Sequence, residues 1–537
     1  MNRRDLLRGT LALTAASMVP ACNSRTTRRG TIAETTLGRI RGQAIDDVVS
    51  FKGIPYGTDT AKTRFQKPLE AKNWTGVLDT NSYGAMAPQP QRPETSARKL
   101  ISSWHIPQSM SEDCLVLNVW TPDLNLQARR PVLVWIHGGG FYSGSGASAV
   151  YDGANLARKG DVVVVTLNHR LNIFGYLYLG ELDPIAYEDS GNIGQHDLLA
   201  ALLWVQRNIE RFGGNPDNVT LFGESGGGQK ICCLLAMEAA RGLFHKAAIQ
   251  SGPYLQAASL HAAKAVGQAA MKRLGLARSQ SQRIEQLTTA EIQSAYRKLP
   301  PSMFLGLGPI VDGRGLTRDP YSPDAPATSH NIPILIGFTR TETTYILGAD
   351  RNFTLDRQGL VARIGEFSPD MDASALVSQY SEVMPEATPS ELFFDITTHL
   401  IMGRDSALIA DRHSAKAPAY FYHLAWSTPV DGGKWQSPHT LDVPLVFDNV
   451  QRAPSTVGHD SDGRAQALAS LMSDAWLSFA RTGTPATPQL PTWPTYTGSR
   501  REIMQLDEHC SVLTDPFQSR HALLSSIPAW NGRSGIG

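Results

Sequence analysis

The sequence predicts an α/β fold in which a mostly parallel central sheet is flanked by helices and carries long insertions. Runs of mainly apolar residues at 131–136, 161–166 and 419–424 are typical of strands buried on both faces. The 47 glycines and 33 prolines indicate many turns between the elements. The motifs described below continue without a linker-like break, so we expect one enlarged domain over residues 32–530.

The amino terminus is predicted to be a separate export signal over residues 1–22, followed by a short linker at 23–31. Arg3 and Arg4 precede a short apolar run at 10–21, a pattern typical of bacterial twin-arginine signals. The apolar run is too short to span a bilayer stably as a mature helix. We therefore expect an exported protein of the periplasm or cell envelope.

The end of this signal resembles a lipobox, in which Cys22 is lipidated and becomes the first residue of the mature chain. Lipidation would tether an otherwise soluble protein to a membrane. The alternative is ordinary cleavage after Ala21, which leaves Cys22 as a free thiol. We favour lipidation.

Ser225 is the strongest candidate for a reactive side chain. Residues 223–227 read Gly-Glu-Ser-Gly-Gly and follow a strand-like run at 219–222, which predicts a sharp strand-to-helix turn, a nucleophile elbow. The glycines are a steric requirement, because the turn brings neighbouring backbone close and holds the serine in a strained conformation. We expect the following helix to continue to Ala240 and to stop at Gly242.

A second glycine-rich segment follows the predicted strand at 131–136 and reads His-Gly-Gly-Gly-Phe over residues 137–141. Ester hydrolysis places negative charge on the carbonyl oxygen, and backbone N–H groups stabilise it only where no side chain blocks their approach. The alternative, a phosphate cradle or dinucleotide loop, is disfavoured because neither fingerprint is present. The segment is therefore predicted to form an oxyanion hole.

Further motifs lie at residues 51–56, 112–120, 168–175, 212–218 and 242–252. They closely resemble those of the type-B carboxylesterase family, which includes para-nitrobenzyl esterases and cholinesterases. The resemblance covers about residues 32–530 and implies an α/β-hydrolase fold with long insertions forming a cap around an active-site gorge.

The resemblance implies a Ser-His-Glu triad of Ser225, His439 and Glu342. A serine hydroxyl is a poor nucleophile, so a histidine must accept its proton and an acid must fix the tautomer of that histidine. Thr341 stands where the family often has Asp, and Asp442 replaces a usual Glu. Both departures leave the triad positions intact.

By the same resemblance, the oxyanion-hole N–H groups belong to Gly139, Gly140 and Gly226. Gly226 opens the helix after the elbow, where the helix dipole is positive. His137 is expected to shape the loop rather than to act as a base.

Several neighbouring residues are expected to support or line this site. The pairs of Arg64 with Glu112 and of Arg170 with Asp197 are expected to hold loops together. Phe141 and the stretch at 300–315, around Met303 and Phe304, are expected to contribute to the walls. Trp104 lies where cholinesterases place a choline-binding tryptophan, but its neighbours do not match that motif, so choline esters are not predicted.

Composition excludes several other classes of function. A net charge of +1 gives no electrostatic footprint for nucleic acid. No Cys/His cluster has metal-ligand spacing, and no cofactor motif is present. The five cysteines include the vicinal pair Cys232 and Cys233 but supply no disulfide framework, and the partner that the family commonly has for Cys114 is missing. The sequence does not determine the oligomeric state.

The sequence therefore predicts a serine carboxylic-ester hydrolase that acts on a small-molecule ester and water through an acyl-enzyme. Its activity is expected to fall as the pH drops through an ordinary imidazole pKa of about 6.5. Hydrolysis of a lactone, carbamate, thioester or amide uses the same machinery and stays open as an alternative. A non-catalytic binding homologue is the second alternative, although such proteins typically lack a triad residue.

Overall fold

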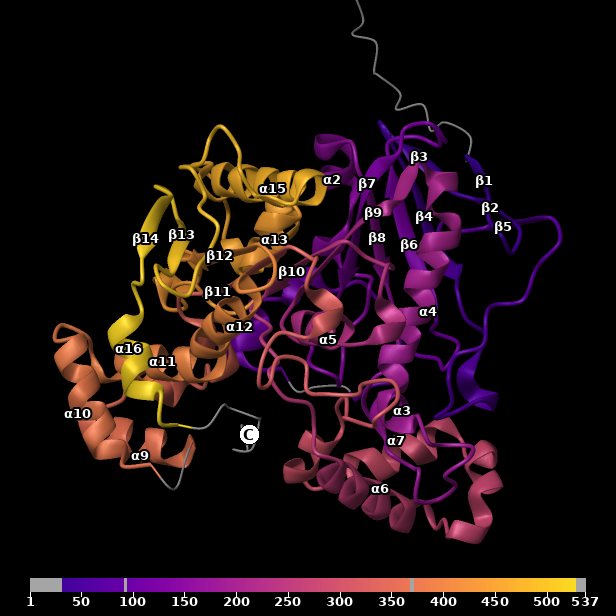
Figure 1. Cartoon of the computed structure of the whole chain (residues 1–537), viewed down its shortest axis with the longest axis horizontal. Coiled ribbons are helices and arrows are strands. Elements are labelled where there is room, and N and C mark those ends of the chain that lie inside the picture. Colours follow the sequence, from indigo (N-terminus) through magenta and orange to yellow (C-terminus); the bar gives the residue numbers. More distant parts are fainter. Residues whose placement is uncertain (1–30, 91–93, 368–370, 528–537) are drawn as a thin grey trace, which may run out of the picture.

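A computed structural model describes residues 31–90, 94–367 and 371–527 of the chain. The predicted export signal, and all of the predicted linker except Thr31, lie outside these residues. Two sheets are present in the described part, one of three strands in the order β1-β2-β5 and one of 11 strands. The order in the large sheet is β14-β13-β12-β11-β10-β9-β7-β8-β6-β4-β3 (Figure 1).

The centre of the large sheet, from β8 to β13, is parallel, and its remaining pairs are antiparallel. This arrangement places the carboxyl ends of the central strands at one edge, where loops from distant parts of the sequence meet. The strands are β1 (Ile32–Glu34), β2 (Arg39–Arg41), β3 (Gln43–Ile45), β4 (Val48–Pro55), β5 (Val77–Asp79), β6 (Val116–Thr121), β7 (Arg130–Ile136), β8 (Val163–Leu167), β9 (Gly214–Glu224), β10 (Lys246–Gln250), β11 (Ile334–Thr339), β12 (Ala419–Leu424), β13 (Glu502–Leu506) and β14 (Ser511–Thr514).

Helices cover both faces of this sheet and gather beyond the carboxyl ends of its strands. They are α1 (Ser96–Lys99), α2 (Ala154–Gly160), α3 (Asn172–Tyr176), α4 (Ile193–Asn208), α5 (Gly226–Leu235), α6 (Leu260–Leu274), α7 (Thr289–Arg297), α8 (Glu342–Ile346), α9 (Arg357–Phe367), α10 (Ala373–Val383), α11 (Pro389–Thr398), α12 (Arg404–Ser414), α13 (Asp442–Val446), α14 (Pro454–Val457), α15 (Arg464–Thr482) and α16 (Gln518–Leu524).

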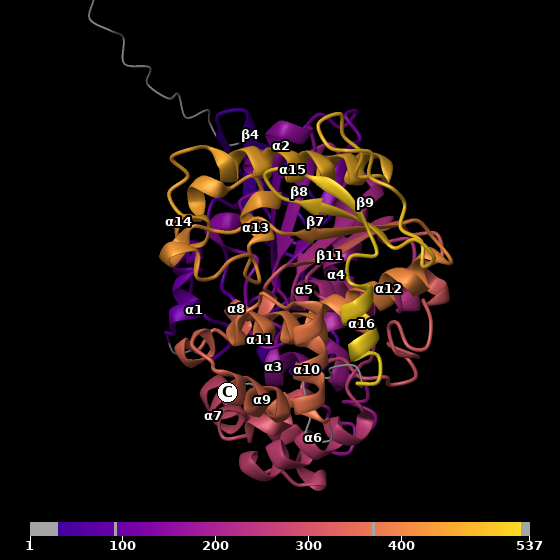
Figure 2. The same ribbon diagram turned by 90° about the vertical axis from the view of Figure 1, so that its left-hand side faces the viewer.

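The central strands divide their side chains between two hydrophobic cores, as alternation along a strand requires. In β7, Val132 and Val134 pack with residues of α4, α5 and α12, whereas Leu133 and Trp135 pack with residues of α2, α13 and α15. Figure 2 shows these two helical layers on opposite sides of the strands. The apolar run that predicted this strand is therefore buried on both faces, which confirms the predicted layered fold.

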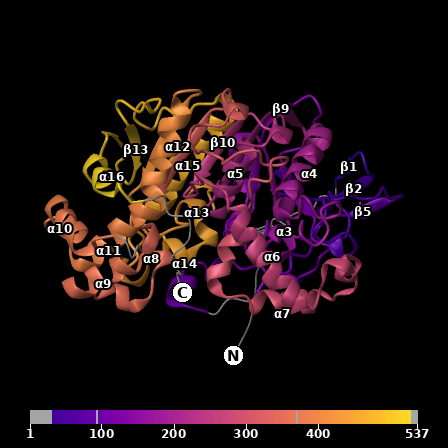
Figure 3. The ribbon, with the colours of Figure 1, turned by 60° about the horizontal axis from the view of Figure 1, so that its bottom comes forward.

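Two further groups of helices pack beyond the carboxyl ends of the strands (Figure 3). One group, α6 and α7, shares a core with α3, which follows β8. The other, α9 to α11, shares a core with the end of α8, which follows β11. Helices α9 to α12 make residues 355–415 mostly helical. Both groups thus lie at the end of the sheet where the candidate site residues meet.

The helix after Ser225 ends earlier than the sequence predicts. Helix α5 stops at Leu235, and Met237 adopts an extended conformation before a short 3-10 turn. The apolar pattern continues past the end of α5 because Ala236, Met237 and Ala240 are buried in the same core. Apolar periodicity indicates which residues are buried, and it does not distinguish one continuous helix from a helix that ends in a buried turn.

The buried pair of Arg170 and Asp197 fixes the loop after β8 to α4, as expected. Arg170 Nη2 lies 2.6 Å from Asp197 Oδ1, and the Arg170 main-chain N–H donates to Asp197 Oδ2 over 2.9 Å. The other expected pair, Arg64 and Glu112, is also buried, with 2.7 Å between Arg64 Nη2 and Glu112 Oε1. Both pairs are structural and hold segments far apart in the sequence.

Asp197→Ala is expected to lower the free energy of unfolding by about 3 to 5 kcal/mol, because it leaves the Arg170 guanidinium buried without its counter-charge. Urea denaturation followed by tryptophan fluorescence measures the change. The matched control is Asp79→Ala, which breaks an exposed pair with Arg41 and is expected to change stability by less than about 1 kcal/mol. Equal losses in the two variants would contradict this interpretation of the buried pair.

Candidate active site

Ser225 occupies the sharp turn between β9 and α5 that the sequence predicts. Its backbone dihedrals are φ 55° and ψ −123°, a conformation that a serine adopts only when its surroundings enforce it. Its N–H donates to the carbonyl oxygen of Gln250 on β10 over 2.8 Å, and its carbonyl accepts from Gln229 N over 3.1 Å. These two bonds fix the turn to the neighbouring strand and to the first turn of α5.

The glycines around Ser225 are required by close backbone contacts. A Cβ at Gly223 would lie 2.7 Å from the carbonyl oxygen of Ile136, and a Cβ at Gly227 would clash with the same oxygen. A Cβ at Gly226 would lie 2.5 Å from the main-chain N of Gly140. The elbow is therefore pressed against the glycine-rich segment that follows β7, and the two predicted halves of the oxyanion hole are in contact.

His439 and Glu342 are brought together from two separate loops. Glu342 opens α8 after β11, and His439 lies just before α13. His439 Nδ1 is 2.5 Å from Glu342 Oε2, and Glu342 Oε1 accepts from Thr339 N over 2.7 Å. Because a carboxylate oxygen accepts, Nδ1 carries the proton and Nε2 faces away from Glu342. This is the tautomer that a general base requires at Nε2.

In the described part of the chain, no hydrogen bond joins His439 Nε2 to the Ser225 hydroxyl. Nε2 lies instead 3.1 Å from Oε1 of Glu224, at the distance of an ion pair. In unliganded sites, catalytic hydrogen bonds are often long and tighten only when substrate binds. The imidazole of His439 is thus flanked by the carboxylates of Glu342 and Glu224 in this structure.

Glu224 is a site residue that the sequence analysis did not single out. Its side chain is buried, and burial raises its pKa well above the ordinary value for a glutamic acid. It lies against the glycine-rich segment, since a Cβ at Gly138 would be 2.7 Å from its Oε2. A carboxyl residue directly before the candidate nucleophile, at the end of an apolar strand, was the signal that could have identified it.

The electrostatic balance at His439 favours its protonated form. Burial alone would lower the pKa of His439, but the carboxylates of Glu224 and Glu342 outweigh burial and raise that pKa above its ordinary value. Asp442 is buried nearby and accepts from Gln250 Nε2 over 2.9 Å and from the Tyr422 hydroxyl over 2.8 Å. Three carboxyl groups therefore surround one imidazole.

The orientation of the glycine-rich loop follows from what its carbonyl groups accept. The Gly138 carbonyl accepts from His137 Nδ1 over 2.8 Å, and the Gly139 carbonyl accepts from Ser143 N over 3.2 Å. In a planar trans peptide the C=O and N–H point in opposite directions, so these bonds also orient the N–H groups of Gly139 and Gly140. Both glycines have positive φ, of 91° and 61° respectively.

His137 supports this loop, and among the described residues no hydrogen bond or ring contact joins it to the candidate triad. Its ring stacks on that of His169, with 4.8 Å between centroids and 10° between planes. Burial is the main cause that lowers the pKa of His137 to about 3 and that of His169 well below its ordinary value. Both rings are therefore neutral near neutral pH, and the loop-shaping role expected for His137 agrees with its bond to Gly138.

Aromatic side chains surround the loop on the side of the predicted wall. The Phe141 ring lies 5.2 Å from Tyr176 and 5.4 Å from Tyr254, and a Cβ at Gly308 would be 3.3 Å from Phe141. The stretch at 300–315 therefore does approach Phe141. Trp104 is instead held in the protein interior, where its Nε1 donates to Thr456 Oγ1 over 2.8 Å.

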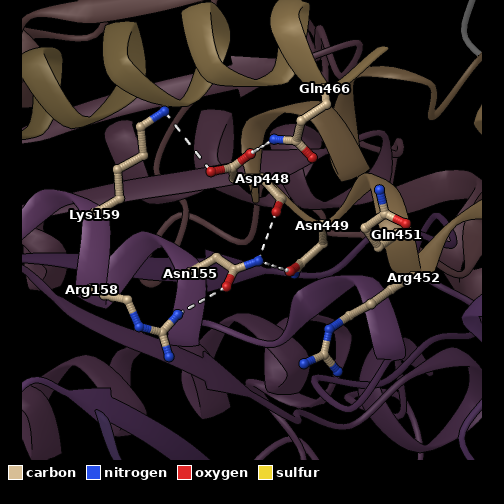
Figure 4. A pocket seen from close by; sticks show the side chains of 8 residues that line it. All are labelled: Asn155, Arg158, Lys159, Asp448, Asn449, Gln451, Arg452 and Gln466. Carbon is tan, nitrogen blue, oxygen red and sulfur yellow. Dashed lines mark hydrogen bonds and ion pairs between the residues drawn. The ribbon is translucent and has the colours of Figure 1, made fainter. Parts of the chain in front are cut away.

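A polar pocket of about 330 Å³ lies elsewhere in the described part of the molecule and shares no residue with the candidate site (Figure 4). Its basic side chains already have acidic or amide partners, since Lys159 lies 3.1 Å from Asp474 and Arg158 donates to Asn155 over 3.1 Å. The pocket is lined by Asn155, Arg158, Lys159, Asp448, Asn449, Gln451, Arg452 and Gln466.

Residues 31–90, 94–367 and 371–527 contain no group of three or more His, Cys, Asp or Glu side chains placed to hold a metal ion. The helices of these ranges include none with the length and apolarity needed to cross a membrane. Cys114, Cys232, Cys233 and Cys510 are free thiols.

Comparison with known proteins agrees with the fold and with the motifs. A model of the carboxylesterase family matches residues 29–523. The chain is 34% identical over 503 residues to the para-nitrobenzyl esterase of Bacillus subtilis (strain 168), a match that covers 92% of this chain and 98% of that protein. It is 30% identical over 511 residues to the phenmedipham hydrolase of Pseudarthrobacter oxydans, with 92% and 99% covered.

Among solved structures, a carboxylesterase of Geobacillus stearothermophilus superimposes with a TM-score of 0.80 at 36% sequence identity, covering 92% of this chain and 99% of that one. The predicted resemblance and the predicted α/β-hydrolase fold are both confirmed. The chain therefore belongs to the carboxylesterase family and is a carboxylic ester hydrolase.

Proposed function

We propose that this enzyme hydrolyses small-molecule esters through an acyl-enzyme on Ser225, with His439 as general base and acid and Glu342 as the residue that orients it. The observation that carries the proposal is the 2.5 Å contact between His439 Nδ1 and Glu342 Oε2 beside the strained Ser225 turn. In the neutral imidazole that contact keeps the ring proton on Nδ1, so Nε2 is the nitrogen that can take the proton of a serine hydroxyl, as a general base must.

In the first half of the reaction, substrate binding brings His439 Nε2 within hydrogen-bond reach of the Ser225 hydroxyl. The Ser225 oxygen attacks the ester carbonyl carbon while Nε2 takes the hydroxyl proton. The carbonyl oxygen becomes an oxyanion, which accepts from the N–H groups of Gly139, Gly140 and Gly226. Collapse of this intermediate breaks the bond to the alcohol oxygen, which leaves with the proton from Nε2.

In the second half, a water molecule replaces the alcohol. His439 Nε2 takes a proton from the water as its oxygen attacks the acyl carbon, and a second oxyanion forms in the same place. When this intermediate collapses, the bond to Ser225 breaks, Ser225 recovers its proton from Nε2, and the carboxylic acid leaves. Both tetrahedral intermediates use the same donors, so one rigid oxyanion hole serves the whole cycle.

A burst experiment tests this sequence of steps. Mixing enzyme with excess para-nitrophenyl acetate is expected to release close to one equivalent of nitrophenol rapidly, followed by slower steady turnover, if deacylation is the slower half. Two nitrophenyl esters of the same acid with different leaving groups should then share one kcat. Turnover that depends on the leaving group, with no common acyl-enzyme trapped by added hydroxylamine, would contradict the proposal.

The pH dependence follows from the carboxylates around His439. Imidazolium cannot act as a base, and a raised pKa keeps His439 protonated to higher pH, so kcat/KM is expected to fall with decreasing pH at a midpoint above 6.5. The midpoint of this fall is therefore expected at a higher pH than the ordinary imidazole pKa, at which the sequence alone places it. Glu224→Gln removes one of the stabilising charges and is expected to shift the midpoint to lower pH. A midpoint below 6.5, or one that Glu224→Gln does not move, would contradict this assignment.

A further inference from the structure

Lys230 is an unusual residue in the second turn of α5, the helix that begins directly after Ser225. Its side chain is fully buried, although lysine is among the residues least often found inside a protein. The Nζ donates to the carbonyl oxygen of Gly140 over 2.7 Å and to that of His137 over 3.2 Å. It also lies 5.7 Å from the centre of the Phe141 ring. Both acceptors belong to the glycine-rich loop after β7.

The two bonds of Lys230 complete the set of carbonyl contacts along this loop. The inner carbonyls, of Gly138 and Gly139, accept from groups within the segment 137–143, as described above. The outer carbonyls, of His137 and Gly140, accept from Lys230. The inner bonds orient each donor peptide, whereas the outer bonds attach the whole loop to α5.

This attachment matters because the predicted oxyanion donors come from two different elements. Gly139 and Gly140 lie on the loop, and Gly226 is the first residue of α5. The contact between Gly140 and Gly226 is close, but glycines supply no side chain to hold it. Lys230 lies one helical turn beyond Gly226, so its side chain spans from the helix to the loop beside the point where the donors meet.

We propose that Lys230 is a positioning residue of the oxyanion hole, which holds the loop donors Gly139 and Gly140 in register with the helix donor Gly226. The inference rests on the proposed function, since it assigns a support to the oxyanion hole used there. The role of Lys230 requires a side chain with N–H donors, and it does not depend on whether that side chain is charged. Burial lowers the pKa of Lys230 to about 7, and an ammonium offers three donors where a neutral amine still offers two.

Lys230→Met tests this role, because methionine fills similar space without a donor. Loss of one oxyanion donor typically lowers kcat by about 10²- to 10³-fold, so loss of a support for the donors is expected to lower kcat by about 10- to 100-fold with little change in KM. Affinity for a trifluoromethyl ketone, which forms a tetrahedral adduct on the serine, should fall by the same factor. A role in stability alone would leave kcat and inhibitor affinity of the folded enzyme unchanged.

The matched control is Lys246→Met. Lys246 is also largely buried and donates to Asn218, but it lies at the amino end of β10, away from the carboxyl ends of the strands. This variant is expected to keep the wild-type kcat and inhibitor affinity. An equal loss of kcat in both variants would mean that removal of any buried lysine impairs the enzyme, and would overturn the inference.

Two further measurements apply if Lys230→Met does not fold. Lys230→Gln keeps a side-chain N–H donor. Its kcat is expected to lie between that of the wild type and the value expected when residue 230 has no donor. A crystal structure of the wild-type enzyme with a trifluoromethyl ketone on Ser225 is expected to keep Lys230 Nζ within hydrogen-bond distance of both loop carbonyls. A structure in which Nζ has left both oxygens would overturn the inference.

Failure of this inference is distinguishable from failure of the proposed function. If the wild-type enzyme forms no adduct on Ser225 with the ketone, the proposed function fails and Lys230 has no oxyanion hole to support. If the wild type forms the adduct and Lys230→Met forms it with equal affinity and equal kcat, only the role of Lys230 is rejected.

Discussion

Ser225→Ala is expected to abolish measurable ester hydrolysis, with a loss in kcat of up to about 10⁶-fold, because the variant has no oxygen to form the acyl-enzyme. It should also abolish labelling by a fluorophosphonate, which reacts with the same oxygen. The fold is expected to persist, since the substitution removes only a hydroxyl group that is not needed for the backbone bonds of the turn. Turnover, in-gel labelling and circular dichroism measure the three outcomes.

A matched control for this variant is Ser251→Ala. Ser251 also follows a central strand with a positive φ, of 47°, and its main-chain N–H donates to Gly337 O over 2.9 Å. Its hydroxyl is buried and has no hydrogen-bond partner among the described residues. We expect this variant to retain fluorophosphonate labelling. Labelling that survives in Ser225→Ala, or disappears only in Ser251→Ala, would assign the nucleophile to another residue.

Glu342→Gln is expected to lower kcat by about 10³- to 10⁴-fold, the effect of leaving a catalytic histidine in the wrong tautomer. The amide of a glutamine can donate to Nδ1, which then holds a lone pair and leaves the proton on Nε2. An imidazole in that state cannot take the proton of Ser225. KM should change little, because Glu342 is fully buried behind His439.

Stopped-flow measurement of the acylation burst checks this prediction, since the rate of the burst should fall by the same factor as kcat/KM. Asp442→Asn serves as the comparison, because it neutralises a nearby carboxyl that makes no hydrogen bond to His439 and accepts instead from Gln250 and Tyr422. Its effect on the burst rate is expected to be smaller than that of Glu342→Gln. Similar losses of burst rate in the two variants would indicate that any nearby negative charge supports His439, and would contradict a specific role of Glu342 in fixing the tautomer of His439.

The sequence predicts the parts of this site whose chemistry imposes a local pattern. Ser225 is recognisable because the elbow needs glycines on both sides, and the glycine-rich segment at 137–141 because backbone donors must be unobstructed. His439 and Glu342 are identified only through the resemblance of longer motifs to those of the family, since no local pattern marks a histidine or a glutamate as a partner of a distant serine. The structure brings these two side chains into contact from loops 97 residues apart.

The sequence does not reveal residues whose importance comes from where the chain folds. Lys230 follows Gln229 in a short helix and would ordinarily be expected on a solvated face. It is buried because the glycine-rich loop crosses α5 at that point and presents its carbonyl oxygens. Glu224 similarly occupies the variable position of the elbow motif, and its influence on His439 depends on a distance of 3.1 Å that no spacing encodes.

The apolar pattern of the sequence also does not determine the residues at which helices and strands begin and end. Strand β9 begins at Gly214, well before the apolar run at 219–222, because Gly214 pairs with Arg130 at the start of β7. The next pair is Val132 with Val219, so the polar residues between Gly214 and Val219 lie in an irregularity of the pairing and carry no apolar pattern that could mark the start of the strand. The early end of α5 at Leu235 has the complementary cause, an apolar run that continues through a buried turn.

The most direct test of the central assignment is the identity of the residue that carries the acyl group. Wild-type enzyme turning over para-nitrophenyl acetate is quenched in acid, digested and mapped by mass spectrometry. We expect one acetyl group on the peptide that contains Ser225, fragmenting to Ser225 itself, and none on that peptide in Ser225→Ala. An acetyl group on a different residue, or full turnover with no acetylated peptide under conditions where deacylation is slow, would contradict the acyl-enzyme mechanism.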